Sequence, residues 1–241
     1  MGSADVIDRL WADVTSRIAP DLSVTLIALG AVIVCVAVPA LWRIVRHVVT
    51  IAHEGGHAVV ALATGRRVSA ITLHADTSGA TTSYGEAKRL PLALVAFAGY
   101  PAPALIGLGA AWLVGRGHAI ALLWIVMLAL ILVLFRIRNA FGLFVMVVAI
   151  GAVGAAAWFL ADPWRVGLAV GITWLLLMGA VRAVVELSAS RRGGRGRGSD
   201  ADALARLTRV PGAVWVAVFW LVTVASAGLG GWLLLADGVT A

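Results

Sequence analysis

Two histidines and a glutamate lie within the apolar stretch "TIAHEGGHAVVALATG", residues 50–65. Residues four apart on a helix project from the same face, so His53 and His57 can both reach one ion. Glu54, next to the first histidine, can then act as general base toward a water that the ion activates. Two neutral imidazoles suit zinc, and a catalytic zinc site takes a third protein ligand and keeps one position open. The spacing therefore predicts a Zn²⁺ site with Glu54 as the catalytic group.

The surroundings of this motif favour a functional role over a structural one. An ionisable side chain at the centre of a membrane costs about 2.5 to 3.5 kcal/mol on insertion scales. Gly55 and Gly56 each add a helix penalty of about 1 kcal/mol relative to alanine. A structural role explains neither cost, whereas a metal site that a substrate backbone approaches closely explains both.

The composition indicates an all-α polytopic membrane protein. The chain has 241 residues, of which 61% are hydrophobic and 13% are charged, whereas an ordinary soluble domain is about 45 to 50% apolar and about 25% charged. Cys35 is the only cysteine, so no cysteine pair can bind metal. We expect six or seven transmembrane helices, because seven stretches have roughly the length needed to cross about 30 Å of hydrocarbon. These stretches are Leu22 to Trp42, Val48 to Thr64, Leu90 to Val114, Ala119 to Phe135, Ala140 to Ala161, Trp164 to Leu187 and Gly212 to Ala236.

The basic residues predict the orientation in the membrane. With seven spans and a cytoplasmic N-terminus, 15 of the 19 lysines and arginines fall in cytoplasmic segments and 4 in outer ones. The outer four are Arg43, Arg46, Arg116 and Arg165, and the opposite orientation would violate the positive-inside rule. Since the net charge of +7 is explained by orientation, we expect lipid rather than nucleic acid as the partner of these residues. The excess of arginine over lysine suggests a bacterial protein of the inner or plasma membrane.

The whole chain, residues 1–241, is predicted to form one integral membrane domain. Residues 1–21 are a polar N-terminal segment, and residues 22–187 contain spans one to six with the motif helix at 48–64. Residues 65–90 have β-branched residues on either side of "DTSG" and predict a short β-hairpin. Residues 188–211 form a basic linker and a short helix before the last span at 212–236. Within the third span, Pro101 and Pro103 must interrupt helical hydrogen bonding, so this span could line a cavity.

The position of His57 along its helix excludes some candidates for the third metal ligand but does not identify a single one. His57 lies eight residues before Gly65, which is about 12 Å from the cytoplasmic end of its helix. The third ligand should come from the same side of the membrane, which excludes Asp162 and Asp237. The remaining candidates are Asp76, Glu86, Glu186, Asp200 and Asp202 among the acids, together with His74.

The sequence resembles the site-2 protease family of intramembrane zinc metalloproteases, specifically its compact branch without an appended peptide-binding domain. The main match is "HEGGH" within a span, at residues 53–57. Four later features look like landmarks of the branch: the hairpin, "AGYPAPALIG" at 98–107, "RNAFG" at 138–142 and "SDADALARLT" at 199–208. The resemblance covers roughly Thr50 to Trp220. It implies cleavage of transmembrane segments of other membrane proteins, and a substrate strand could pair with an edge of the hairpin.

The chain departs from the family pattern at the third ligand, which is usually an aspartate followed by glycine on a later span. The only Asp-Gly pair here is Asp237-Gly238, close to the C-terminal residue. On the resemblance we favour Asp200 as the third metal ligand and keep Asp202 as the alternative, although either could simply cap the short helix. Asn139 is a further candidate for binding substrate or metal.

Two other functions stay open on the sequence. The missing Asp-Gly pair is compatible with an inactive family member that binds membrane proteins as a scaffold. The broken third span is compatible with a small permease, but no repeat related by symmetry is visible, and transporters commonly have one.

Overall fold

The computed structural model describes residues 2–192 and 198–236, and within these ranges it contains ten helices and one two-stranded sheet. The predicted all-α class is confirmed. Part of the predicted basic linker, residues 193–197, and the Asp237-Gly238 pair lie outside the described residues. The elements are α1 Ser3–Thr15, α2 Leu22–Ala37, α3 Pro39–Ala63, β1 Arg67–Leu73, β2 Gly79–Tyr84, α4 Arg89–Ala98, α5 Pro101–Gly115, α6 Ala119–Leu134, α7 Ala140–Phe159, α8 Asp162–Arg192, α9 Asp200–Thr208 and α10 Gly212–Ala236.

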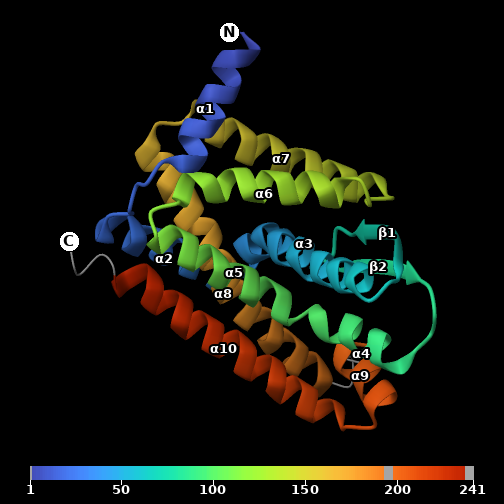
Figure 1. Ribbon diagram of the computed structural model, residues 1–241. Helices are drawn as coiled ribbons and strands as arrows, with labels where there is room; N and C mark the ends of the chain where they lie inside the picture. Colours follow the sequence, from blue (N-terminus) through green and yellow to red (C-terminus); the bar gives the residue numbers. More distant parts are fainter. Residues whose placement is uncertain (1, 193–197, 237–241) are drawn as a thin grey trace.

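Three helices, α7, α8 and α10, are each long and apolar enough to cross a membrane. Two bent pairs, α2 with α3 and α4 with α5, raise the number of candidate spans to five, and α6 is a shorter apolar helix of 16 residues. In Figure 1, α6 and α7 lie side by side on one flank of α3, and α5, α8 and α10 pack together on the other. The helix that carries the histidines is therefore enclosed between two groups of apolar helices.

The motif helix α3 begins earlier than the sequence predicted. We expected a first span to run to Trp42 and the motif helix to start at Val48, but the chain bends by 106° and α3 starts at Pro39. Proline lacks the N–H that would continue α2, and its fixed φ suits the first position of a new helix. As a result Arg43 and Arg46, which we had assigned to an outer connection, lie within α3.

The third span is broken just before Pro101. Helix α4 ends at Ala98, α5 starts at Pro101, and their axes differ by 59°. Pro103 sits in the first turn of α5, where the missing N–H has no partner inside the helix. The predicted interruption is thus present, and it brings the backbone around Gly99 against α3.

The predicted β-hairpin is confirmed, and its two strands differ in their outer edges. β1 and β2 pair antiparallel, with Ile71 opposite Thr81. The other edge of β1 is occupied by the segment before α7, since Ile71 N donates to Arg136 O at 2.8 Å and Ile71 O accepts from Arg138 N at 3.1 Å. Among the described residues, no other segment makes a backbone hydrogen bond to the outer edge of β2.

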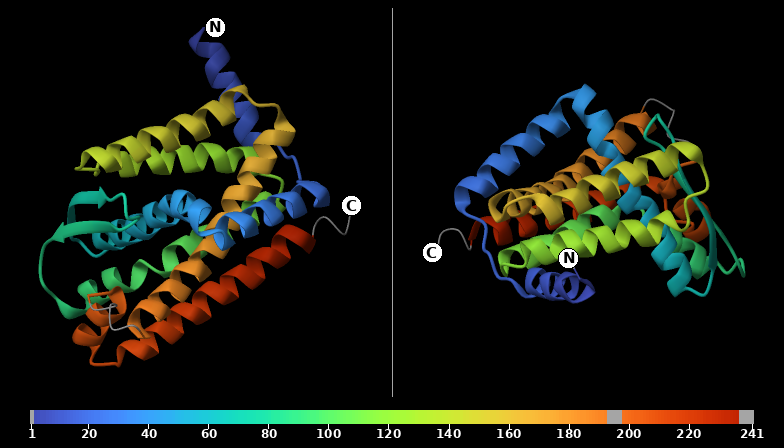
Figure 2. Two further views of the ribbon diagram at one scale, coloured as in Figure 1. Left: turned by 180° about the vertical axis from the view of Figure 1, so that it is seen from behind. Right: turned by 90° about the horizontal axis from the view of Figure 1, so that it is seen from above.

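The N-terminal segment lies at the end of the molecule away from the hairpin (Figure 2). Ile18 pairs with His118 at the start of α6, whereas Ile71 in the hairpin pairs with Ile137 beyond the end of α6. The 16 residues of α6 separate these two contacts by about 24 Å. The N-terminal segment and the hairpin therefore lie at opposite ends of α6.

Contacts of α1 support this placement. The Arg9 guanidinium stacks 4.3 Å from the Trp158 ring near the end of α7 and donates to the Trp158 carbonyl. Arg165, near the start of α8, contacts Asp13 at 2.5 Å. The N-terminal helix is therefore attached to the ends of α7 and α8 that lie farthest from the hairpin.

Candidate metal centre

Three ligand atoms from two helices converge beside the hairpin. His53 and His57 project from one face of α3, and their Nε2 atoms lie 3.1 Å apart. Asp200, the first residue of α9, places its Oδ2 atom 3.2 Å from His53 Nε2 and 3.4 Å from His57 Nε2. Of the acids that the sequence left open, Asp200 is the one that joins the two histidines.

The spacing of these atoms fits a tetrahedral metal site. Ligands held tetrahedrally around zinc at about 2.0 to 2.1 Å lie about 3.3 Å from one another. The three separations in the structure bracket this value. Oδ2 of Asp200 is buried, and among the described residues its charged contacts are the two imidazole nitrogens, so a cation held between the three atoms would balance its charge.

The backbone of α4 orients the second histidine. Nδ1 of His57 lies 2.7 Å from the carbonyl oxygen of Val95. A carbonyl can only accept a hydrogen bond, so Nδ1 carries a proton, and Nε2 is the nitrogen that has the lone pair when the imidazole is neutral. An outer partner of this kind fixes the tautomer of a metal-binding histidine.

Asp200 is held in place by the packing of its helix. Ala201 and Leu204 of α9 are buried against Ala96 of α4 and Phe219 of α10. Burial by itself raises the pKa of the Asp200 carboxyl, but the imidazoles of His53 and His57 outweigh this effect and lower that pKa. The carboxyl is therefore ionised and able to bind a cation without first losing a proton.

The alternative ligand, Asp202, points away from the histidines. Its Oδ1 atom accepts from Arg191 at 2.5 Å, and its Oδ2 atom accepts from Gly198 N at 3.0 Å. The hydrogen bond from Arg191 lowers the pKa of Asp202. Asp202 thus accepts a backbone hydrogen bond at the start of α9 and connects this helix to the end of α8 through Arg191. This is the capping role that the sequence allowed.

Glu54 is buried next to the histidines, with 4% of its surface exposed. The Oγ1 atom of Thr81 in β2 lies 2.7 Å from Glu54 Oε2 and 3.0 Å from the Glu54 carbonyl oxygen, and its single proton is donated to one of these two acceptors, of which Oε2 is the nearer. β2 therefore lies directly over the carboxylate. The sequence predicted Glu54 as a base but gave no sign that Thr81 would hold it.

Gly99 is a site residue that sequence reasoning missed. A Cβ atom there would lie 2.6 Å from Nε2 of His53 and 2.6 Å from Cε1 of His57. The break between α4 and α5 thus presses bare backbone against both imidazoles. Its signal in the sequence was a glycine directly before the Tyr-Pro of the interrupted span.

The two glycines of the motif have separate surroundings. A Cβ at Gly56 would lie 2.4 Å from the Ala102 side chain, so this glycine lets α5 approach α3. A Cβ at Gly55 would meet nothing within 4 Å. Close packing of the broken span accounts for Gly56, whereas the space beside Gly55 is open.

Asn139 lies apart from the three ligand atoms. Its Nδ2 atom donates to the Leu73 carbonyl at 2.6 Å, and its Oδ1 atom accepts from Leu73 N at 3.2 Å. The side chain thus binds β1 as a neighbouring strand would and fastens the hairpin to the start of α7. Both hydrogen-bonding groups of the amide are engaged there.

The remaining candidate ligands have other partners. Asp76 accepts from Ser78 Oγ at 2.6 Å, Glu86 contacts Lys88 at 2.6 Å and Glu186 contacts Arg46 at 3.3 Å. His74 lies 3.4 Å from Ser78 Oγ.

Two cavities meet at the histidines and share His53, Glu54 and Gly79. One has a volume of about 470 Å³ and is lined by His57, Asp200 and the strand residues Ala80 and Thr81. The other, about 490 Å³, is lined by polar residues that include Arg46, Thr77 and Glu186. Both cavities therefore reach His53 and Glu54.

Comparison with known proteins gives the family of this chain. A family model described as peptidase M50B-like matches residues 26–230. The chain therefore belongs to this family, which is the site-2 protease family. No curated protein and no solved structure matches the chain.

Proposed function

We propose that the protein is an intramembrane zinc metalloprotease that cleaves transmembrane segments of other membrane proteins. The observation that carries the proposal is the convergence of His53, His57 and Asp200 at tetrahedral spacing beside Glu54. Family membership and the apolar helices support a membrane protease.

The residues of the site suit peptide hydrolysis. A zinc ion held by the three ligands would polarise the scissile carbonyl and lower the pKa of the attacking water. Glu54 takes a proton from that water as its oxygen forms a bond to the carbonyl carbon. The same carboxyl then gives the proton to the leaving nitrogen as the C–N bond breaks. Thr81 orients the carboxylate for both transfers.

The hairpin offers a way to bind the substrate. A helical segment hides its peptide bonds, so it must unwind before a water can attack one of them. In the described part of the chain no backbone hydrogen bond is made to the outer edge of β2, which lies beside Glu54, and an extended segment can add to such an edge as a further strand. β1 cannot serve, because the segment before α7 occupies its outer edge.

We propose that the hairpin end of the molecule is cytoplasmic and that the N-terminus lies on the opposite side. Ten basic residues described by the structure lie in or beside the connections at the hairpin end, against four at the other. The ten are Arg66, Arg67, Lys88, Arg89, Arg136, Arg138, Arg191, Arg192, Arg206 and Arg209, and the four are Arg9, Arg17, Arg116 and Arg165. The positive-inside rule then places the metal centre toward the cytoplasm. A bacterial inner or plasma membrane is the setting that the arginine-rich composition favours.

The test is cleavage of model transmembrane substrates by the purified, zinc-loaded protein. Glu54→Gln should retain zinc and lose cleavage, whereas the matched control Glu86→Gln, at an exposed residue, should cleave like wild type. Equal cleavage by wild type and Glu54→Gln would refute the proposal. Stoichiometric zinc without any cleavage by wild type would instead favour the inactive scaffold, to which the missing Asp-Gly pair had pointed.

A further inference from the structure

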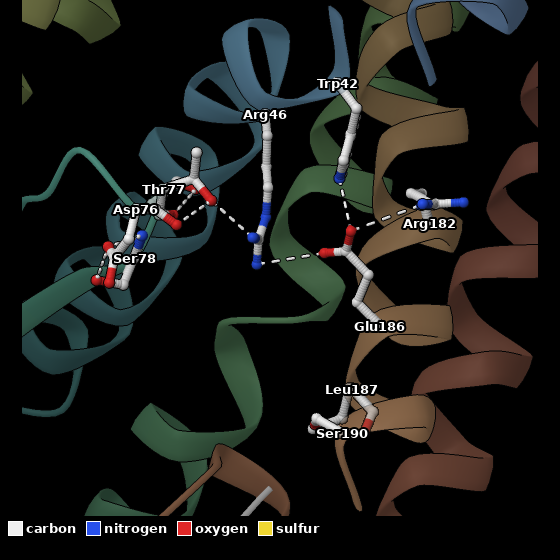
Figure 3. Close-up of polar contacts among 10 residues, drawn as sticks. Trp42, Arg46, Asp76, Thr77, Ser78, Arg182, Glu186, Leu187 and Ser190 are labelled. Carbon is white, nitrogen blue, oxygen red and sulfur yellow. Dashed lines mark hydrogen bonds and ion pairs between the residues drawn. The ribbon is translucent and has the colours of Figure 1, made fainter. Parts of the chain in front are cut away.

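A polar bridge joins α8 to the hairpin through one arginine of the motif helix (Figure 3). Arg46 Nη2 lies 3.3 Å from Glu186 Oε2 on α8, and Arg46 Nη1 donates to Thr77 Oγ1 in the hairpin turn at 2.6 Å. The two side chains of the ion pair are 35% and 29% exposed. Charged residues within membrane helices are costly and commonly serve a function.

The α8 end of this bridge is fixed by further contacts. Trp42 donates from Nε1 to Glu186 Oε1 at 2.7 Å, and Arg182 Nε lies 3.6 Å from the same oxygen. Figure 3 shows both side chains converging on the Glu186 carboxylate from different helices. Arg46 is therefore anchored to a carboxylate that has little freedom to move.

The hairpin end of the bridge is a buried and unusual turn residue. Thr77 is 3% exposed and has a φ of 69°. A left-handed conformation is rare for a β-branched residue, so the contacts made by this threonine must hold it there. Its carbonyl accepts from Thr50 Oγ1 at 2.9 Å, and its hydroxyl donates to the Asp76 carbonyl while it accepts from Arg46.

The turn leads directly to the residues that touch the catalytic carboxylate. Arg46, Thr50 and Glu54 are spaced by four residues, so they share one face of α3. Two residues after Thr77, a Cβ at Gly79 would lie 2.7 Å from Glu54 Cγ and 2.8 Å from Oε1. Two residues further, Thr81 donates to Glu54. The depth at which the turn docks on α3 therefore sets the position of β2 over Glu54.

We propose that Arg46 is a positioning residue that latches the hairpin onto α3 through Thr77. The latch keeps Glu54 oriented and keeps the edge of β2 in place for substrate. This role rests on the proposed protease function. The contacts of the latch, from Arg46 to Thr77 and to Glu186, include none of the metal ligands.

The experiment compares Arg46→Gln, Thr77→Val and Thr77→Ser in the full-length, zinc-loaded protein. Arg43→Gln is the matched control, because Arg43 is an exposed arginine of the same helix. Hydrogen–deuterium exchange of residues 67–84, zinc content, kcat and KM are measured for each variant. Arg46→Gln and Thr77→Val should exchange the hairpin amides at least about tenfold faster and keep their zinc. Their kcat should fall roughly 10- to 100-fold with a smaller change in KM. Thr77→Ser keeps the hydroxyl and should restore slow exchange and kcat.

Each outcome separates the latch from the proposed activity. Hairpin exchange in Arg46→Gln and Thr77→Val that is no faster than in Arg43→Gln would overturn the latch. Faster exchange with unchanged kcat would show a merely structural contact and overturn the positioning role. A wild-type protein that cleaves nothing would refute the protease function, while the exchange data would still decide whether the latch exists.

Discussion

Thr81 Oγ1 lies 2.7 Å from Glu54 Oε2, so a residue of the hairpin holds the carboxylate of the motif helix. The contact joins the element proposed to bind substrate to the group proposed to move the proton. The hairpin must therefore be docked on α3 for Thr81 to orient the Glu54 carboxylate. A substrate strand added to β2 would lie in a fixed relation to Glu54.

Thr81→Val should lower kcat roughly tenfold or more, because the carboxylate loses the donor that orients it for proton transfer. Thr81→Ser keeps a hydroxyl and should retain most of the activity. Thr82→Val is a suitable control, since Thr82 is an exposed residue of the same strand. Cleavage rates at saturating substrate measure the effect, and equal rates for Thr81→Val and Thr82→Val would contradict it.

Gly99→Ala should weaken zinc binding by roughly 10- to 100-fold, the range found when an outer partner of a metal ligand is disturbed. The added methyl group would lie 2.6 Å from ring atoms of both histidines and would push them apart. Competition with a chelator measures the affinity. Gly109→Ala on α5 adds a methyl group into open space and should bind zinc normally. Normal zinc affinity in Gly99→Ala would show that this close approach does not constrain the site.

Asp200→Ala should lose stoichiometric zinc, whereas Asp202→Asn should keep it. Asp200 supplies a ligand atom, while Asp202 binds Arg191 and the start of α9. Metal analysis of the purified variants checks the difference. Zinc retained by Asp200→Ala but lost by Asp202→Asn would reverse the assignment of the third ligand.

The N-terminus and the hairpin should be accessible from opposite sides of the membrane. In a Cys35→Ser background, Asp8→Cys and Tyr84→Cys place single thiols at exposed residues of α1 and β2. An impermeant maleimide added to intact cells should label Asp8→Cys at once and Tyr84→Cys only after permeabilisation. Labelling of both from one side would contradict the arrangement of α1, α6 and the hairpin.

Protonation of the Asp76 carboxylate at acid pH should alter the conformation of the hairpin turn. The hydroxyl and the amide of Ser78 both donate to this carboxylate and hold its pKa below the ordinary value of 3.8. The lowered pKa means that the contact stabilises the turn above about pH 3.8 and is lost as pH falls through the folded-state value. The amide chemical shift of Ser78 should follow this transition. Asp76→Asn should abolish the transition, and a midpoint above 3.8 would contradict the expected direction.

The membrane fold and part of the site could be predicted from local sequence. Long apolar stretches require helices because a bilayer offers no other partners for backbone groups. The four-residue spacing of His53 and His57 determines that they share a face, since this depends only on helix geometry. The hairpin followed from β-branched residues around a turn sequence. Each of these features depends on residues close together in the chain.

What the tertiary structure decided is which distant residues meet. Asp200 lies 143 positions after His57, and only the packing of α9 on α4 and α10 brings it to the histidines rather than Asp202. The contacts of Gly99 and Thr81 with the site likewise depend on a bend between helices and on the docking of a strand. The sequence by itself determined the helix that presents two imidazoles and a carboxylate. Completing their surroundings required long-range packing, because such contacts depend on the sum of many weak apolar interactions that no local pattern records.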